Sequence, residues 1–230
     1  MAAQAIDIRR IGTEQQPLLI MDNALADPVA WVRLAGEAPF QSPPGGYYPG
    51  LNAPMAPSLV SPLVHRLRPA IEQAFGFPAT QDVQLMGYLA LATAPAYTLQ
   101  PIQRVPHYDA VDQDQLSILC YLCAPKHGGT GFYRHDRTGF ETIDAARQAR
   151  FRVERDADYG KLKTSRHVGP WTEGYTLFEA VPADFNRLIM YRSNALHSGL
   201  LTDETLSADP ETGRLTLNIF IRPTPRGNTA

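Results

Sequence analysis

The pattern of apolar and polar residues predicts a short strand and then a helix near the start of the chain. Residues 17–21 (PLLIM) form an apolar run between polar segments, which is typical of a buried strand. Asp27 and Pro28 make a helix start, with Asp27 as the N-cap and Pro28 in the first turn. The apolar residues that follow at helical spacing are expected to face the core; they are Trp31, Leu34 and Ala35.

A second helix is predicted after a long loop. Residues 41–57 contain so many prolines and glycines that no regular structure is expected there. Ser61 and Pro62 repeat the helix-start pattern, and Gly76 is expected to end the helix. Pro69 lies inside this segment, where it favours a kink. The apolar stripe that defines the helix consists of Leu63, Leu67, Ile71 and Phe75.

From Val83 onward the pattern changes to that of strands. The segments that predict them are VQLMGYLALATA, QLSILCYLC, GTGFYRH, NRLIMYRS and RLTLNIFIRP. A polar insertion at about 136–184 is expected to be partly helical. The 20 prolines and 17 glycines also favour a β-rich fold with many turns. We therefore expect one mainly β (α+β) domain over residues 1–230, with a strand and helix support region at 1–82 packed outside a β core at 83–223.

Composition narrows the class of protein. With 44% hydrophobic and 19% charged residues, the chain is ordinary for a globular protein. A net charge of -2 gives no footprint for nucleic acid or an acidic membrane, and no apolar run approaches the roughly 20 residues of a membrane span. The first residues lack the pattern of a secretory signal, and two cysteines cannot form a disulfide scaffold. A cytoplasmic location is expected.

Three residues suggest a metal site. His107 and Asp109 close one strand-like segment, and strand residues two positions apart point to the same face. His197 follows another predicted strand and would complete three ligands on one side of an ion. Two histidines and one carboxylate, with positions left open, suit non-haem iron(II). An H-x-D pair also arises by chance in a chain with six histidines, so the pair alone does not establish the site.

The last predicted strand adds an anion-binding candidate. Arg214, Thr216 and Asn218 alternate with apolar residues and share one face of the strand. An arginine that points into a barrel must find an anion, because a buried unpaired charge is costly. A carboxylate held by both arms of the guanidinium is the natural partner. The alternatives are a protein carboxylate or solvent.

The order of these motifs resembles the prolyl-hydroxylase-like branch of the iron(II)- and 2-oxoglutarate-dependent oxygenases. H-x-D is followed by SILCYLCAPKHGGTGF, then by NRLIMYRSNALHSG and GRLTLNIFI, so the resemblance covers about 84–223. It implies a double-stranded β-helix, a relative of the jelly-roll and cupin architectures. It also implies that His107, Asp109 and His197 bind iron.

The resemblance implies further roles around the cosubstrate. Arg214 matches the basic residue that binds the distal carboxylate of 2-oxoglutarate. Tyr121 matches a tyrosine whose hydroxyl supports that carboxylate, and Thr216 stands where a hydroxyl residue often assists. The tyrosine expected before the metal pair is either Tyr88 or Tyr97.

The sequence departs from the family pattern in several places. Cys123 replaces an asparagine, and the loop before Arg214 contains an extra segment, LSADPETG. That longer loop leaves Arg222, on the same strand face, as an alternative anion ligand. Gln103 and Arg104, just before the metal pair, are further candidates for lining the pocket.

The reaction implied by the resemblance consumes Fe(II)-bound 2-oxoglutarate and O2, releases succinate and CO2, and hydroxylates a C–H bond. The substrate is expected to be a small molecule or an amino-acid or peptide side chain, with no nucleic acid or membrane partner. Residues 41–57 and 136–184 are candidate substrate-facing walls, and the second is a candidate mobile lid. The oligomeric state stays open, with a homodimer as one option. Two alternatives are a JmjC- or cupin-type metalloenzyme and a catalytically inactive β-helix binding module.

Other features favour structural interpretations. Cys120 and Cys123 are predicted to point to opposite faces of a strand as packed thiols. Gly128 and Gly129 are expected to let the chain turn tightly into a strand, because no phosphate-loop pattern follows them. Four histidines have no predicted role, and His127 and His135 among them are expected at the surface; the others are His65 and His167. Three aromatic residues fit either a substrate pocket or a cover over the core: Tyr47, Tyr48 and Trp171.

Overall fold

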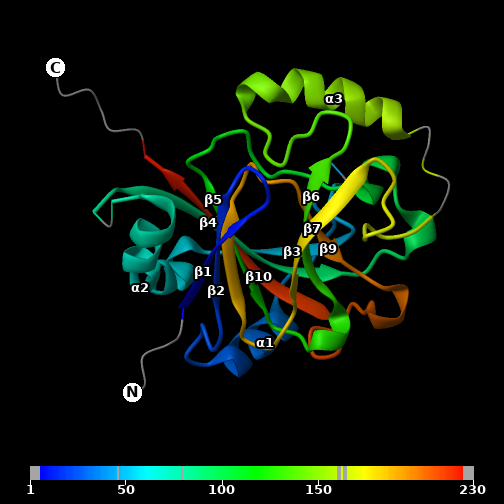
Figure 1. The fold of residues 1–230 in the computed structure, drawn as a ribbon. Coiled ribbons are helices and arrows are strands. Elements are labelled where there is room, and N and C mark those ends of the chain that lie inside the picture. The colour runs from blue at the N-terminus through cyan, green and yellow to red at the C-terminus, as the bar shows by residue number, and fades with distance from the viewer. Residues whose placement is uncertain (1–5, 46, 79, 160–161, 163–164, 225–230) are drawn as a thin grey trace.

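Antiparallel strands dominate the computed structural model, in which they form two sheets (Figure 1). In its described part, the larger sheet has seven strands in the order β1-β2-β8-β5-β10-β4-β3, and the smaller has three in the order β7-β6-β9. The described residues are 6–45, 47–78, 80–159, 162 and 165–224. The strands of the larger sheet are β1 (Ile6–Ile11), β2 (Gln16–Met21), β3 (Gly50–Met55), β4 (Val83–Ala92), β5 (Leu116–Tyr121), β8 (Leu188–Arg192) and β10 (Arg214–Pro223).

The smaller sheet and the helices complete the fold. The strands of the smaller sheet are β6 (Gly129–His135), β7 (Tyr175–Pro182) and β9 (His197–Leu200). The α-helices are α1 (Pro28–Glu37), α2 (Pro57–Phe75) and α3 (Ala145–Tyr159). Short 3-10 helices occupy the connections; they are η1 (Ala96–Thr98), η2 (Pro101–Arg104), η3 (Pro125–His127) and η4 (Asp203–Thr205).

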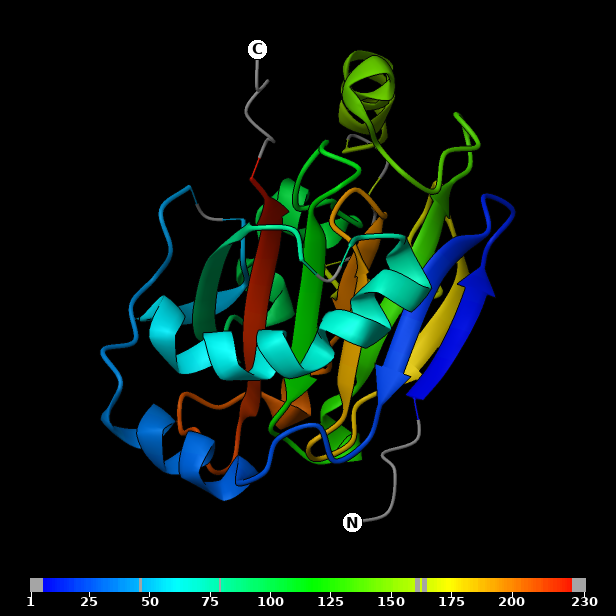
Figure 2. The ribbon, with the colours of Figure 1, turned by 90° about the vertical axis from the view of Figure 1, so that its left-hand side faces the viewer.

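The period-two alternation of the strands separates the two faces of the larger sheet. On β10, every second residue packs in a cluster with α2, which lies across this face (Figure 2); these residues are Leu215, Leu217, Ile219 and Ile221. Arg214, Thr216 and Asn218 therefore point to the opposite face, toward the smaller sheet. The same alternation places Cys120 in the cluster on the helix side and Cys123 in the cluster between the sheets, as predicted.

Two further clusters hold the remaining layers together. Between the sheets, Tyr121 and Ile189 of the larger sheet pack with Phe132 and Val181 of the smaller one. Outside the smaller sheet, α3 inserts Phe151 against that sheet, in a third cluster. The layers are thus α1 and α2, the larger sheet, the smaller sheet, and α3.

The predicted helices form, with differences at their starts. Asp27 caps α1 by accepting a hydrogen bond from the backbone N–H of Ala30, as its sequence position predicts. Leu34, expected in the core, is instead 37% exposed, because α1 turns only part of its apolar face inward. Helix α2 begins at Pro57, before the predicted start, and ends before Gly76 as predicted. Within the described ranges, no helix is both long and apolar enough to cross a bilayer.

Two segments that were expected to lack strands contain them. Strand β3 lies inside 41–57, where it pairs with β4 at the edge of the larger sheet. Pro54 is tolerated there because an edge strand leaves one side unpaired. Strand β7 lies inside the insertion at 136–184 and pairs with β6, and α3 supplies the helix expected in that insertion. Strand β1, which has few buried residues, was not predicted.

Gly128 makes the tight turn into β6 that the sequence predicts. Its φ of 88° and ψ of -123° are accessible almost only to glycine, and an added Cβ would meet the carbonyl oxygen of Leu200. The backbone of this turn also donates from Gly128 N–H to the Pro125 carbonyl. Glycine is therefore required here by both conformation and space.

Replacing Gly128 by alanine is expected to lower the free energy of unfolding by about 3 kcal/mol, because backbone strain adds to overpacking. Gly139→Ala is the matched control: its φ is 74°, but nothing lies within 4 Å of the added Cβ. The control should lose only about 1 kcal/mol. Urea unfolding of both variants measures the difference, and equal losses would show that the Leu200 contact does not matter.

Candidate metal centre

The backbone brings His107 and His197 side by side. The two residues form an isolated antiparallel bridge, with His107 N–H donating to the His197 carbonyl at 2.9 Å and His197 N–H donating back at 2.8 Å. The expectation that His107 ends a strand is wrong, since this bridge replaces a strand. Pro106 lacks the N–H that a longer ladder needs, and η2 precedes it. Directly opposed residues point to the same face, and the two rings lie 4.4 Å apart.

Asp109 completes the predicted set of three. Its carboxylate lies 3.7 Å from His107 Nε2 and 3.6 Å from His197 Nε2. One donor atom from each residue lies within 4.8 Å of the other two. The Asp109 backbone N–H is held by the Ser193 carbonyl at 2.8 Å, in the connection between β8 and β9. Residues far apart in the sequence thus present two imidazoles and one carboxylate to a common point.

Hydrogen bonds to outer residues fix the orientation of two of these side chains. His197 Nδ1 lies 2.9 Å from the Ala195 carbonyl, so it carries the hydrogen and leaves Nε2 with its lone pair. Ser117 Oγ donates to Asp109 at 2.7 Å and lies 2.7 Å from Ser193 Oγ. Such outer partners orient the ligands of a metal ion. The arrangement is therefore one that can receive a cation without reorganising.

Replacing Ser117 by alanine is expected to weaken Fe(II) binding about 10-fold, because the Asp109 carboxylate loses the hydroxyl that orients it. Ser198→Ala is the matched control: this serine is also buried and is next to His197, but its hydroxyl contacts the Gly199 carbonyl. Anaerobic calorimetric titration with Fe(II) measures both affinities. An unchanged affinity in Ser117→Ala would show that Asp109 needs no such support.

His107 is the most accessible of the three candidate ligands. Its side chain is 51% exposed, against 18% for Asp109 and 7% for His197. Burial lowers the pKa of His107 to about 4, with a further decrease from His197 and an opposing increase from Asp109. The neutral imidazole, which is the form that binds metals, therefore prevails at neutral pH.

Arg214 lies on the inner face of β10, where it is 3% exposed. Its Nη2 donates to the Gly129 carbonyl at 2.9 Å, and its guanidinium lies 5.8 Å from the Tyr121 ring. Within the described part of the chain, no carboxylate forms an ion pair with it, and its buried Nε has no hydrogen-bond partner. The longer loop before β10 has thus not removed Arg214 from the interior.

Tyrosines connect Arg214 to the metal ligands. Burial raises the pKa of Tyr191 well above its ordinary value, and the charges of Asp109 and Arg214 both act on it. The Tyr191 ring also packs against the His197 ring at 4.7 Å. Burial likewise raises the pKa of Tyr88, with a contribution from Asp109. Ser117, which donates to Asp109, lies on β5 next to β10, so the Asp109 carboxylate and the Arg214 guanidinium are both on the inner side of the larger sheet.

The other predicted cosubstrate residues flank Arg214. Thr216 is 1% exposed on the inner face of β10 and accepts a hydrogen bond from Asn218 Nδ2. Tyr121 is fully buried, and its hydroxyl donates to Thr130 Oγ1 at 2.7 Å. Both lie beside Arg214, but the Tyr121 proton is directed at the smaller sheet.

Several sequence candidates lie apart from these residues. Tyr97 is 75% exposed, whereas Tyr88 adjoins Asp109. The Arg222 side chain is 64% exposed and lies 4.0 Å from the Asp112 carboxylate. Arg104 donates to the carbonyl of Leu99 in its own loop.

Two histidines are buried, so their predicted surface position is wrong. His135 is fully buried, with Nε2 3.0 Å from the Asp158 carboxylate and Nδ1 2.8 Å from Thr138 Oγ1. His127 is 3% exposed, with Nδ1 3.2 Å from the Thr205 carbonyl. Hydrogen-bonded polar groups are tolerated in the interior, and these partners could not be identified from the sequence.

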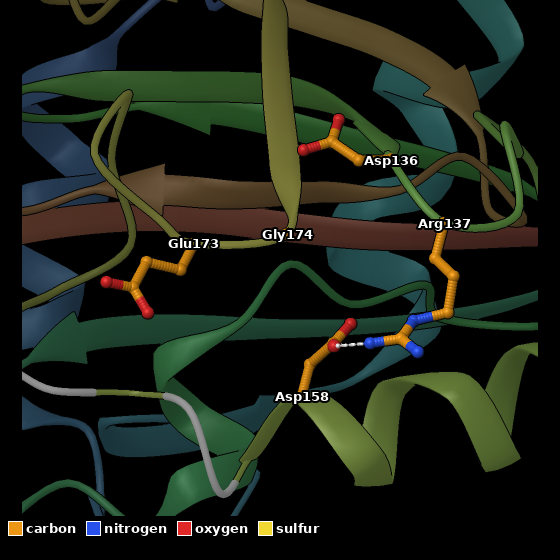
Figure 3. A pocket seen from close by; sticks show the side chains of 5 residues that line it. All are labelled: Asp136, Arg137, Asp158, Glu173 and Gly174. Carbon is orange, nitrogen blue, oxygen red and sulfur yellow. Dashed lines mark hydrogen bonds and ion pairs between the residues drawn. The ribbon is translucent and has the colours of Figure 1, made fainter.

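A hollow of about 410 Å³ lies elsewhere, between α3 and the start of β7 (Figure 3). Asp158, at the end of α3, reaches Arg137 there, with 2.7 Å between carboxylate and guanidinium. Asp136 accepts a hydrogen bond from Thr176 at 2.6 Å. The Arg137–Asp158 ion pair fastens the end of α3 to the turn after β6, and the Asp136–Thr176 hydrogen bond joins that turn to β7.

Sequence reasoning missed Ser117 and Asn52, which line the same inner face. Ser117 alternates with Leu116 and Ile118, so its face was predictable but its contact with Asp109 was not. Asn52 belongs to β3, whose alternating Leu51, Ala53 and Met55 gave a weak strand signal inside a segment rich in proline and glycine.

One protein family matches almost the whole chain. The model of a family described as a family of unknown function, DUF6445, matches residues 2–221. None of the curated proteins matches the chain.

Solved structures share the fold at low sequence identity. HygX from Streptomyces hygroscopicus, with nickel and 2-oxoglutarate bound, is 12% identical with a TM-score of 0.54, over 92% of this chain and 85% of that one. SnoK, a non-heme alpha ketoglutarate dependent carbocyclase from nogalamycin biosynthesis, is 15% identical with a TM-score of 0.52, over 91% and 81%. The fold of this chain is therefore one that HygX and SnoK also adopt.

Proposed function

The chain belongs to the family of unknown function DUF6445, and we propose that it is an iron(II)- and 2-oxoglutarate-dependent oxygenase. The observation that carries the proposal is the cluster of His107, Asp109 and His197 on the inner side of the sheet that also buries Arg214, whose guanidinium has no carboxylate partner among the described residues. A cation bound by the three side chains, and a dicarboxylate that reaches from it to the Arg214 guanidinium, would satisfy both groups.

The donor set fits iron(II). Two imidazole nitrogens and one carboxylate on one side of an ion leave its other positions open, which is the arrangement of non-haem iron oxygenases. The hydrogen bonds from His197 Nδ1 and to Asp109 hold two of the three donors in place. Iron(II) with 2-oxoglutarate and O2 would supply the oxidising chemistry, with release of succinate and CO2.

The protein's own residues would bind, orient and shield. His107, Asp109 and His197 would hold the metal, and Arg214 would pair with the distal carboxylate of the cosubstrate, assisted by Thr216. Tyr88 adjoins Asp109 and is the better placed of the two tyrosines considered from the sequence, since Tyr97 faces solvent.

Comparisons with oxygenases support the proposal. HygX has been solved with 2-oxoglutarate bound, and SnoK is described as alpha ketoglutarate dependent, so one protein with this fold binds that compound and another depends on it. We extend the proposal to a double-stranded β-helix core of the prolyl-hydroxylase-like branch, which the order of the motifs favours. The fold supports no particular substrate by itself.

We further propose a small molecule or an amino-acid or peptide side chain as the substrate, and hydroxylation of a C–H bond as the reaction. The segment before β3 supports a role as one wall, because its Tyr48 adjoins Arg214. The insertion contributes α3, whose Gln148 donates to the Tyr108 hydroxyl beside the metal pair. Cys120 and Cys123 are both free thiols, as a reducing cytoplasm would keep them.

Calorimetric titration with 2-oxoglutarate, with and without Fe(II) under anaerobic conditions, tests the proposal. We expect one equivalent to bind, and to bind more tightly when Fe(II) is present, because the keto acid end would contact the metal. Glutarate, which has both carboxylates and no keto group, should gain little from the metal. Equal effects of Fe(II) on the two ligands would contradict the proposal.

A further inference from the structure

Strand β3 brings a second polar wall to the space in front of Arg214. The register aligns Gly50 of β3 with Ala92 of β4, and Ala92 with Arg214 of β10. It aligns Asn52 with Ala90 in the same way, and Ala90 with Thr216. Because Ala53 and Met55 pack on the helix side, the Asn52 side chain points inward, to the same face as Arg214.

The strand between the two walls carries small side chains. Ala90 and Ala92 are fully buried, yet neither belongs to the apolar clusters on either side of the larger sheet. Strands β3 and β10 are two strand spacings apart, or about 10 Å. On this face, Ala90 and Ala92 of β4 place no large side chain between the polar residues of β3 and those of β10.

Polar atoms without hydrogen-bond partners lie on or beside both β3 and β10. Among the described residues, the buried Tyr48 hydroxyl and the buried Asn52 Oδ1 have no hydrogen-bond partner, and neither has Arg214 Nε. Burial of a polar group without a partner is unfavourable, so several in one place indicate a ligand that satisfies them. Tyr48 lies two residues before β3, and its neighbour Tyr47 is 70% exposed.

Tyr48 lies near Arg214. Burial raises the pKa of Tyr48 to about 12, and the positive charge of Arg214 acts against that increase. The phenol is therefore neutral at physiological pH and keeps a hydrogen to donate. A Cβ added at Gly50 would lie 2.9 Å from the Tyr48 ring, so the ring lies beside the start of β3, and Tyr48 and Asp109 both raise the pKa of Tyr88.

Tyr121, the tyrosine suggested by the family resemblance, is placed differently. Its hydroxyl already donates to Thr130 Oγ1, and the other acceptor within its reach is the Val181 carbonyl, at 3.5 Å. A carboxylate only accepts hydrogen bonds, so it needs a hydroxyl whose hydrogen is free. Tyr48 meets that condition in this structure.

We propose that Tyr48, from the segment that leads into the edge strand β3, donates its hydroxyl hydrogen to the distal carboxylate that Arg214 binds. The inference rests on the proposed 2-oxoglutarate dependence and adds a residue from outside the motifs of the β core. The carboxylate would thus be held from both walls, by Arg214 on β10 and by Tyr48 beside β3.

Anaerobic titration of the Fe(II)-loaded protein tests this inference, with the visible charge-transfer band of the iron–keto acid chelate as the readout. Tyr48→Phe is expected to weaken 2-oxoglutarate binding about 10-fold, as the loss of a hydrogen bond to a charged group predicts. Binding of 2-oxobutyrate, which has the keto acid end but no distal carboxylate, should stay within about twofold of the native protein. Tyr47→Phe is the matched control and should change neither affinity.

The outcomes separate the possibilities. Equal weakening of 2-oxoglutarate and 2-oxobutyrate binding would mean that Tyr48 affects the site as a whole and not the distal carboxylate. Unchanged binding of both would mean that Tyr48 makes no contact with the cosubstrate. Either result overturns the inference. A selective loss in Tyr121→Phe and none in Tyr48→Phe would assign the role to Tyr121 instead. If the native protein forms no band with either keto acid, the proposed function itself fails.

Discussion

Replacing His107 by alanine is expected to weaken Fe(II) binding by at least about 100-fold, since even outer partners of metal ligands contribute 10-fold to 100-fold. His107 provides one of two imidazoles, and its low pKa keeps the ring neutral, with one nitrogen lone pair available, at neutral pH. The variant should remain folded, because the side chain is half exposed. Anaerobic calorimetry with Fe(II) measures the loss.

His65→Ala is the control for this prediction, because His65 is exposed on α2, on the other side of the larger sheet from His107. It should bind Fe(II) as the native protein does. If His107→Ala also retains native affinity, the metal does not bind through His107, and the close approach of the three side chains has another cause.

Replacing Arg214 by methionine is expected to weaken 2-oxoglutarate binding about 100-fold while Fe(II) binding stays unchanged. Loss of one partner from a buried charge pair costs about 2–5 kcal/mol, and Arg214 is almost fully buried with no carboxylate of the described chain to pair with. Methionine retains much of the volume of the side chain, so packing against Tyr121 is largely kept. Titration of the Fe(II)-loaded variant measures the change.

Arg222→Met is the matched control on the same strand, since the Arg222 side chain is 64% exposed. Native affinity for 2-oxoglutarate in Arg214→Met would favour the JmjC- or cupin-type alternative, in which the cosubstrate is anchored elsewhere. A loss in Arg222→Met and none in Arg214→Met would move the anion site to the far end of β10.

The inner face of β10 was predictable because strand alternation is a local property. Arg214, Thr216 and Asn218 alternate with Leu215 and Leu217 in the sequence, and the same alternation separates the two faces of the strand in the structure. Asp27 likewise caps α1 through a contact within one helical turn. Features that depend on neighbouring residues were therefore available from the sequence.

Features that depend on distant partners were not. The edge strand β3 forms because β4 offers it a ladder, which outweighs the proline and glycine that predicted a loop. His135 can be buried because its Nε2 forms a hydrogen bond with the Asp158 carboxylate, on α3. Tyr48 could be assigned no direction from the sequence, since its position relative to Arg214 depends on the order of β3, β4 and β10 in the sheet.

Anaerobic absorption spectroscopy of the native protein shows whether iron(II) and 2-oxoglutarate bind together at one site. We predict that the visible charge-transfer band appears only after both Fe(II) and 2-oxoglutarate are added, and that it is absent from His107→Ala. If correctly folded native protein binds both components yet shows no band, then iron(II) and 2-oxoglutarate do not bind at one site. Folded protein that binds neither would favour the inactive binding module.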